Sequence, residues 1–189
     1  MKKLVAIVSV WLVATAFTTL DVWKSDKAHS QLGFTVTHLG IADVSGTFND
    51  FDVTIQSNKE DFSDAVFELT AKVASVNTGI EARDNHLKNA DFFDAEKYPV
   101  IKFKSTEIKK RKKNQYKLIG NLTMHGVTKP VTLNLVYRGQ TTNPMSNAIT
   151  TGFQLTGEIK RTDFGVGSNF PDVAISDVVK IKADGEFTK

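Results

Sequence analysis

Residues 65 to 73 read AVFELTAKV, and this stretch indicates the fold class more clearly than any other. Apolar side chains occupy its odd positions from Ala65 to Val73, whereas Glu68, Thr70 and Lys72 occupy even ones. Neighbouring side chains of a β-strand point to opposite faces, so apolar residues at every second position share one face. The stretch therefore predicts a strand that buries one face and exposes the other.

The same alternation recurs along most of the chain and gives at least eight strand-like segments, joined by short turns that carry Gly, Asn or Asp. No stretch of a dozen residues has a helical pattern outside residues 78–97. Many amphipathic strands with few helices predict an all-β fold, either a sandwich or a closed antiparallel barrel, and the pattern alone leaves both open. The apolar positions of the other segments are Leu32, Phe34, Val36, Phe51, Val53, Ile55, Ile101, Phe103, Leu118, Leu122, Met124, Val131, Leu133, Leu135, Tyr137, Phe153, Leu155, Ile159, Val179, Ile181 and Phe187.

The first residues, MKKLVAIVSVWLVATAF, have the form of a secretory signal. Two lysines precede an apolar run from Leu4 to Val13, and Ala14-Thr15-Ala16 supplies a small-x-small cleavage step. We therefore expect residues 1–16 to be removed and residues 17–189 to form a single domain. The run is shorter than the roughly 20 residues of a spanning helix, so we expect no transmembrane segment in the mature chain. The short leader favours the bacterial periplasm.

Charge and cysteine content exclude several classes of function. Removing Lys2 and Lys3 with the leader lowers the net charge from +3 to +1, which gives no basic face for nucleic-acid binding. The absence of cysteine excludes disulfides, thiol catalysis and Cys-based zinc sites. One basic run, KKRKK at 109–113, is interpreted as a solvated hairpin tip, and contact with an anionic membrane surface is its alternative.

Residues 83–99, RDNHLKNADFFDAEKYP, interrupt the alternation. Asn77 or Thr78 is expected to cap a short helix, and Pro99 ends the segment before the next strand. The cluster of Arg83, Asp84 and His86 contains the groups used in acid and base catalysis. The favoured interpretation is structural, because charges near helix ends commonly pair with the backbone and with each other. The segment is then a crossover that covers one open end of the sheet.

The other motifs give no specific catalytic or metal site. The four histidines, His29, His38, His86 and His125, lack the close spacing of a metal-binding motif, and no GxSxG sequence is present. In RTDFGVGSNFP, residues 161–171, Arg161 and Asp163 are interpreted as residues that fix an ordered loop. We therefore expect no enzyme activity, no metal and no cofactor, although a metal site assembled from distant segments remains open.

Five segments together resemble the YceI-like family of bacterial exported lipid-binding proteins. They are HSQLGFTVTH (29–38), VSGTFNDFDVTI (44–55), SVNTGIEARDNHLKNADFFDAEKYPVIKFKST (75–106), GNLTMHGVTKPVTL (120–133) and RTDFGVG (161–167). They occur in the family's order and at similar spacing, and they cover nearly all of the chain from Trp23 onward. One local departure is SVNTG, where the family more often has a serine and an acidic or hydrophobic residue ahead of Thr78.

The resemblance implies an antiparallel eight-stranded lipocalin-like barrel with a short helical crossover near residues 78–97, whose interior binds a long-chain isoprenoid or similar lipid. Its function would be binding, transport or storage of that lipid. His38, Arg83 and His86 lie beside turns and are the candidates for contact with a polar head group. The predicted wall contacts to the chain are Phe34, Val36, Phe51, Phe67, Leu69, Phe103, Leu122, Leu133, Leu135, Phe153, Leu155 and Ile181.

Small residues that share the parity of the apolar faces are expected to leave room inside the barrel, and these are Ala65, Ala71, Gly120, Gly157 and Ala183. An eight-stranded barrel either fills with its own side chains or keeps a small ligand cavity. A filled β-domain that acts as an interaction module is therefore an alternative, and a metal-dependent enzyme is a less favoured one. An exposed strand edge would also permit a homodimer.

Overall fold

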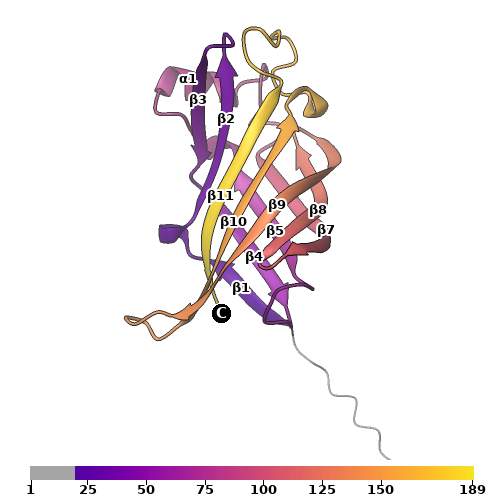
Figure 1. Cartoon of the computed structure of the whole chain (residues 1–189). Helices are drawn as coiled ribbons and strands as arrows, with labels where there is room; N and C mark the ends of the chain where they lie inside the picture. Colours follow the sequence, from indigo (N-terminus) through magenta and orange to yellow (C-terminus); the bar gives the residue numbers. More distant parts are fainter. Residues whose placement is uncertain (1–19) are drawn as a thin grey trace, which may run out of the picture.

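The computed structural model describes residues 20–189, so the predicted leader lies outside the described residues. These described residues form eleven strands, one α-helix and three short 3-10 helices. Their order is β1 (Asp21–Ser25), η1 (Lys27–His29), β2 (Gln31–His38), β3 (Ala42–Phe48), β4 (Phe51–Ser57), β5 (Val66–Lys72), η2 (Val73–Ser75), β6 (Val76–Asn77), α1 (Glu81–Lys88), β7 (Val100–Lys112), β8 (Gln115–Met124), β9 (Val127–Thr142), β10 (Ile149–Lys160), η3 (Thr162–Phe164) and β11 (Val178–Thr188). Figure 1 shows these strands wrapped into one barrel, with α1 beside its upper end.

The eleven strands correspond to eight long ones, because three of the eight are interrupted. β1 and β2 form the first, β3 and β4 the second, and β5 and β6 the third. The pairings show this: β2 pairs with β3 and β1 with β4, while β4 pairs with β5 and β3 with β6, all antiparallel. The remaining five strands, β7 to β11, follow in sequence order. β7 pairs with β5, and each later strand pairs with the one before it, all antiparallel. The sheet is therefore a simple meander.

The last strand closes the sheet on the first. One edge of β11 pairs with β10 along its whole length, and its other edge pairs with β2 and then with β1. The structure therefore decides between the two architectures that the alternation left open: it is a closed eight-stranded antiparallel barrel with one short helix. The predicted lipocalin-like fold class is confirmed.

An aromatic cluster fills the lower end of the barrel, where β1, β4 and β5 begin or end. The loop of residues 58–65 between β4 and β5 folds inward and buries Phe62, which lies at a positive φ of 55°. Its ring centroid lies 5.6 Å from that of Trp23, 5.2 Å from Tyr137 and 5.0 Å from Phe153. This cluster closes the barrel at that end, and we call it the floor.

Polar contacts hold the floor loop in place. The Tyr116 hydroxyl donates to the Asp61 carbonyl at 2.6 Å, and the Lys110 ammonium lies 2.7 Å from the Asp61 carboxylate. The hydrogen bond from Lys110, followed by that from Ser63, lowers the pKa of Asp61 to about 2. The basic run at 109–113 therefore lies at the floor end. Residues 109–112 are the last residues of β7, and Lys113 begins the β7–β8 turn. All five residues are exposed, which agrees with the predicted solvated hairpin tip.

The crossover between β6 and β7 contains α1, as predicted, but its cap differs. Ile80 occupies the N-cap position without a side-chain cap bond, so the expected cap by Asn77 or Thr78 is wrong. The Thr78 side chain instead donates to Asp84 Oδ1 at 2.6 Å, and the Asn77 side chain accepts from the Gly79 amide. Phe92 is buried beneath the turns that follow α1. The crossover lies against the upper end of the barrel (Figure 1).

Candidate functional site: an apolar cavity in the barrel

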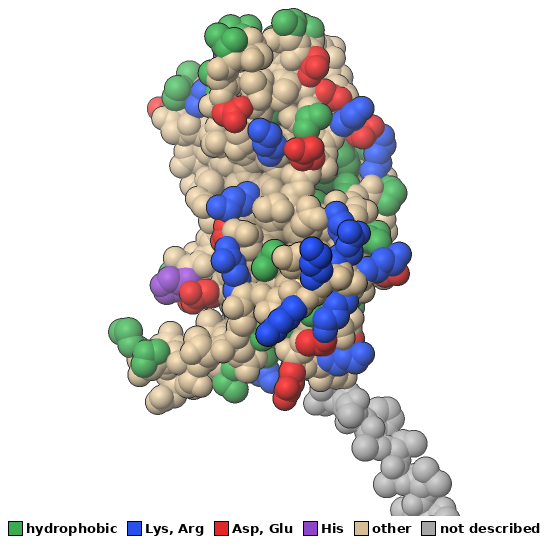
Figure 2. Space-filling model, in the orientation of Figure 1, with side chains coloured by type: hydrophobic (Ala, Val, Ile, Leu, Met, Phe, Trp, Pro, Cys, Tyr) green, Lys and Arg blue, Asp and Glu red, His purple; other side chains and the backbone are tan. Residues whose placement is uncertain are grey.

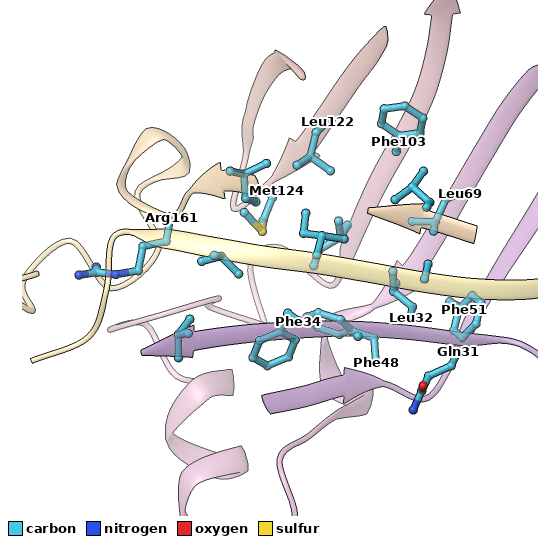
Figure 3. A pocket seen from close by; sticks show the side chains of 18 of the residues that line it. Gln31, Leu32, Phe34, Phe48, Phe51, Leu69, Phe103, Leu122, Met124 and Arg161 are labelled. Atoms are coloured by element: carbon cyan, nitrogen blue, oxygen red, sulfur yellow. The ribbon is translucent and has the colours of Figure 1, made fainter. Parts of the chain in front are cut away.

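A cavity of about 540 Å³ lies between the floor and the upper loops. Aliphatic and aromatic side chains from every strand except β1 and β6 line it. The polar side chains at its wall occur only toward the two ends. Ser30, Gln31 and Asp184 lie at one end, and His38, Thr78, Arg83, His86 and Arg161 lie at the other. Figure 3 shows this arrangement, with Gln31 and Arg161 at opposite ends of a row of apolar side chains.

Three segments surround the upper end of the cavity: the turn between β2 and β3, the crossover with α1, and the loop of residues 161–177. Hydrogen bonds fix the crossover side. Arg83 donates from Nε to Thr78 Oγ1 at 2.7 Å and from Nη2 to the Thr78 carbonyl at 2.9 Å. Asp84 Oδ1 accepts from both the amide and the hydroxyl of Thr78. Arg83 and Asp84 therefore fix the backbone at Thr78, as the structural interpretation of this charge cluster predicted.

Aromatic rings join the crossover to the loop of residues 161–177. The Phe92 and Phe170 rings are stacked with centroids 4.8 Å apart, and the His86 ring packs edge-on against Phe92 at 5.0 Å. His86 Nε2 also lies 3.4 Å from an Asp91 carboxylate oxygen. The crossover and the loop thus form a common cover over part of the upper end.

Arg161 organises that loop from inside. Its side chain is buried, and all five guanidinium N–H groups have backbone carbonyl acceptors, as such a donor set requires when water is excluded. Nη1 donates to Val166 and Gly167, Nη2 donates to Phe170 and Ile175, and Nε donates to Ser176. The predicted role of Arg161 in fixing the loop agrees with this geometry, and Asp163 pairs with Lys129 on β9 at 2.8 Å.

We expect Arg161→Met to lower the free energy of unfolding by about 2–3 kcal/mol, because buried carbonyls lose their donors. Arg161→Lys should recover only part of this loss, since an ammonium has three donors and cannot reproduce the planar fork. Urea unfolding of the three proteins measures the difference. Equal stability of Arg161→Met and wild type would show that water replaces the guanidinium at no cost.

The structure places every predicted site residue at the cavity. All twelve predicted wall residues line it, and so do His38, Arg83 and His86. Their contact with a ligand stays a prediction. The alternation also marked nine residues that line the cavity but are not in the predicted set, namely Leu32, Val53, Ile101, Leu118, Met124, Val131, Ile159, Val179 and Phe187. No periodic signal marked the lining residues of the crossover and the last loop, which are Leu87, Phe92, Phe93, Val166, Phe170, Ala174 and Ile175.

The small residues contribute less space than predicted. Among the five, only Ala183 lines the cavity. A Cβ atom at Gly120 would lie 2.6 Å from the Phe103 ring, and one at Gly157 would overlap the Leu133 side chain. These glycines therefore let large side chains of neighbouring strands pack over them.

The described residues contain one cluster with metal-capable groups, and it lies outside the cavity. Asp26, His29 and Glu186 bring their ligand atoms within 4.8 Å of one another at the protein surface. The His29 Nδ1 atom lies 2.9 Å from Asp26, and this hydrogen bond raises the pKa of His29. The cluster is therefore explained as the hydrogen-bonded pair of Asp26 and His29 beside a second acid, Glu186. Residues 20–189 also contain no helix with the length and apolarity that crossing a membrane requires.

Comparisons with known proteins agree with this architecture. Residues 23–187 match the family described as the YceI-like domain. A UPF0312 protein of Staphylococcus aureus (strain N315) is 35% identical over 167 residues, which span 86% of this chain and 95% of that protein. The crystal structure of a Campylobacter jejuni YCEI protein is 33% identical, with a TM-score of 0.73, over 93% of this chain and 98% of that one.

A third comparison extends the fold to a more distant protein. A structure described as a polyisoprenoid binding domain from Saccharophagus degradans, implicated in plant cell wall breakdown, is 18% identical to this chain. It covers 90% of this chain and 99% of its own, with a TM-score of 0.68. At this identity the likeness shows a common fold.

Proposed function

Because the chain belongs to the YceI-like domain family, we propose that its barrel binds a long-chain isoprenoid or a similar amphiphilic lipid, without catalysis, as a carrier or store. One observation carries the proposal, namely a cavity of about 540 Å³ whose central wall is entirely apolar. The Saccharophagus degradans domain with this fold is described as polyisoprenoid binding, which supports the same ligand class here.

The energetics of chain burial agree with this proposal. Each buried methylene contributes roughly 0.8 kcal/mol, so a dozen chain carbons contribute about 10 kcal/mol before the cost of association is subtracted. The cavity wall supplies no polar group along its middle, so recognition of the tail depends on shape and apolarity. Tail burial is therefore sufficient for tight binding without a metal or a covalent bond.

Polar groups at the upper end fit a polar head group. Arg83 uses Nε and one N–H of Nη2 to hold Thr78, which leaves three of its five N–H groups for a ligand or water. His38 and His86 line the same end and supply imidazole donors or acceptors. We therefore place the head group beside Arg83 and the tail toward the floor.

Arg83→Ala is expected to weaken binding of geranylgeranyl phosphate about tenfold, or 1.4 kcal/mol, because a charge-assisted hydrogen bond is lost. Binding of geranylgeraniol, which has the same tail and no charge, should change less than twofold. Titration with both ligands measures the difference, and Lys88→Ala on the same helix is the matched control. Equal losses for both ligands would place the head group elsewhere.

The decisive test of the function is mass spectrometry of organic extracts from protein purified without detergent. We expect a lipid with a long apolar chain in stoichiometric amount, and we expect geranylgeraniol to bind the emptied protein. Absence of both a co-purified lipid and binding in titration would refute the carrier hypothesis. Ala183→Trp, described below, provides a control in which the cavity is blocked.

We also propose a periplasmic location, supported by the signal-like leader at residues 1–16. Cell fractionation of a bacterial host followed by intact mass measurement tests it. The expected product lies in the periplasmic fraction and begins at Phe17. A cytoplasmic product that retains Met1 would contradict the proposal.

A further inference from the structure

Exposed aliphatic side chains gather around the upper end of the cavity. Ile41 is 86% exposed, Val173 is 73% exposed, and Leu39 and Ile80 are each about half exposed. They come from the β2–β3 turn, the loop of residues 161–177 and the start of the crossover, which are the three segments that surround this end. We call these four residues the rim. Figure 2 shows hydrophobic side chains on the uppermost tips of the molecule.

Each rim residue is close in sequence to a residue of the cavity wall. Leu39 follows His38, and Ile41 lies three residues after His38. Val173 precedes Ala174, and Ile80 lies three residues before Arg83. The Leu39 amide also donates to the Ala174 carbonyl at 3.1 Å, so the β2–β3 turn and the loop are joined. Single exposed apolar residues are common on protein surfaces, but several that border one apolar cavity indicate an interaction site.

The opposite end of the cavity has a different surface. Near Ser30 and Gln31, the exposed side chains include Lys27, His29 and Glu186, which are charged or titratable. Exposed apolar residues also occur toward that end, at Leu20, Val22, Met145 and Ile149. None of these four residues lines the cavity or is adjacent in sequence to a residue that does. The two ends of the cavity therefore differ. Transfer from water into an apolar environment would cost less free energy for the surface around the upper end, because its exposed side chains are apolar.

We propose that the rim inserts into the surface of a lipid bilayer, so that the ligand passes between membrane and cavity without crossing water. This proposal rests on the proposed function and adds the place of exchange. An apolar rim continuous with an apolar cavity fits a bilayer surface, because both then contact hydrocarbon. Acids adjoin the rim at Asp43, Glu81 and Asp172, so the favoured surface is zwitterionic rather than anionic.

The experiment compares rates of transfer from phosphatidylcholine vesicles loaded with geranylgeraniol. The full chain is expressed and exported, separated from the vesicles by flotation at successive times, and analysed for bound ligand by mass spectrometry. The test variant is Ile41→Asn with Val173→Asn. The control is Met145→Asn with Ile149→Asn, two exposed apolar residues in and beside the β9–β10 turn, at the floor end.

We expect the rim variant to take up ligand at least tenfold more slowly from vesicles and to float less with empty ones. Its affinity for geranylgeraniol added without vesicles should stay within twofold of wild type. The control variant should behave as wild type in both assays. Unchanged transfer by the rim variant, or equal slowing by the control, would overturn the proposal.

Two further outcomes are informative. In one of them, more protein floats with vesicles that contain phosphatidylglycerol, and the rim variant floats as well as wild type. That result would place the membrane contact on a basic surface and refute insertion of the rim. If wild type binds no geranylgeraniol without vesicles, the proposed function fails. Flotation of empty vesicles still tests the rim separately.

Discussion

Phe62→Ala is expected to lower the free energy of unfolding by about 3–5 kcal/mol, the range for truncating a fully buried phenylalanine. The Phe62 ring lies in contact with Trp23, Tyr137 and Phe153, so its removal leaves a cavity lined on several sides. The loop that carries it is tied down by Tyr116 and Lys110 and cannot easily move inward. The melting temperature should fall by about 10 °C or more.

Thermal and urea unfolding measure this effect, and Met145→Ala is the control because Met145 is 94% exposed. A second consequence is specific to the floor. Because the ring closes one end of the barrel, its loss should lengthen the cavity and permit a longer tail to bind. A loss below 1 kcal/mol would show that the floor loop collapses into the space and that Phe62 is not essential for closure.

Ala183→Trp is expected to weaken geranylgeraniol binding at least 100-fold, which corresponds to about 2.8 kcal/mol. Ala183 lies on β11 opposite Leu32 and Leu155 in register, and all three line the cavity. An indole at this position would project into the open volume between these neighbouring strands. The cavity accommodates the new side chain, so the fold should persist while the ligand is excluded.

Lys182→Trp is the matched control, because Lys182 is exposed on the outer face of the same strand. Titration gives the affinities, and circular dichroism checks that both variants are folded. Val53→Trp blocks the cavity from β4 and keeps the test valid if Ala183→Trp fails to fold. Wild-type affinity in a folded Ala183→Trp or Val53→Trp protein would show that the ligand binds outside the barrel.

The period-two alternation was sufficient to predict the wall of the candidate site. A strand has two faces, so the parity of Phe34, Leu69 and Leu155 assigned their side chains to one face before any pairing was known. The closed barrel has one interior, and these faces therefore meet around the same cavity. This explains why all twelve predicted wall residues line it, although their contact with a ligand is still to be measured.

Parity could not predict the ends of the cavity, because irregular segments have no period. Phe62 reaches the floor through a loop with positive φ, and Phe170 reaches the upper end through a loop held by Arg161. The local sequence around Phe62 and Phe170 does not distinguish these buried residues from exposed residues of a loop. The prediction that small residues leave open space inside the barrel was wrong at the glycines for a related reason. Gly157 provides space, but the side chain of Leu133 on the neighbouring strand occupies it.

The sequence by itself therefore determined the strands, the inward face of each and, through resemblance, the family. These properties depend on local alternation and on motifs that are continuous in the chain. Only the tertiary structure decided that β11 pairs with β1 and β2 and closes a barrel, that its middle stays open, and that the apolar rim borders the cavity. These properties depend on contacts between residues more than 100 positions apart, which no local pattern specifies.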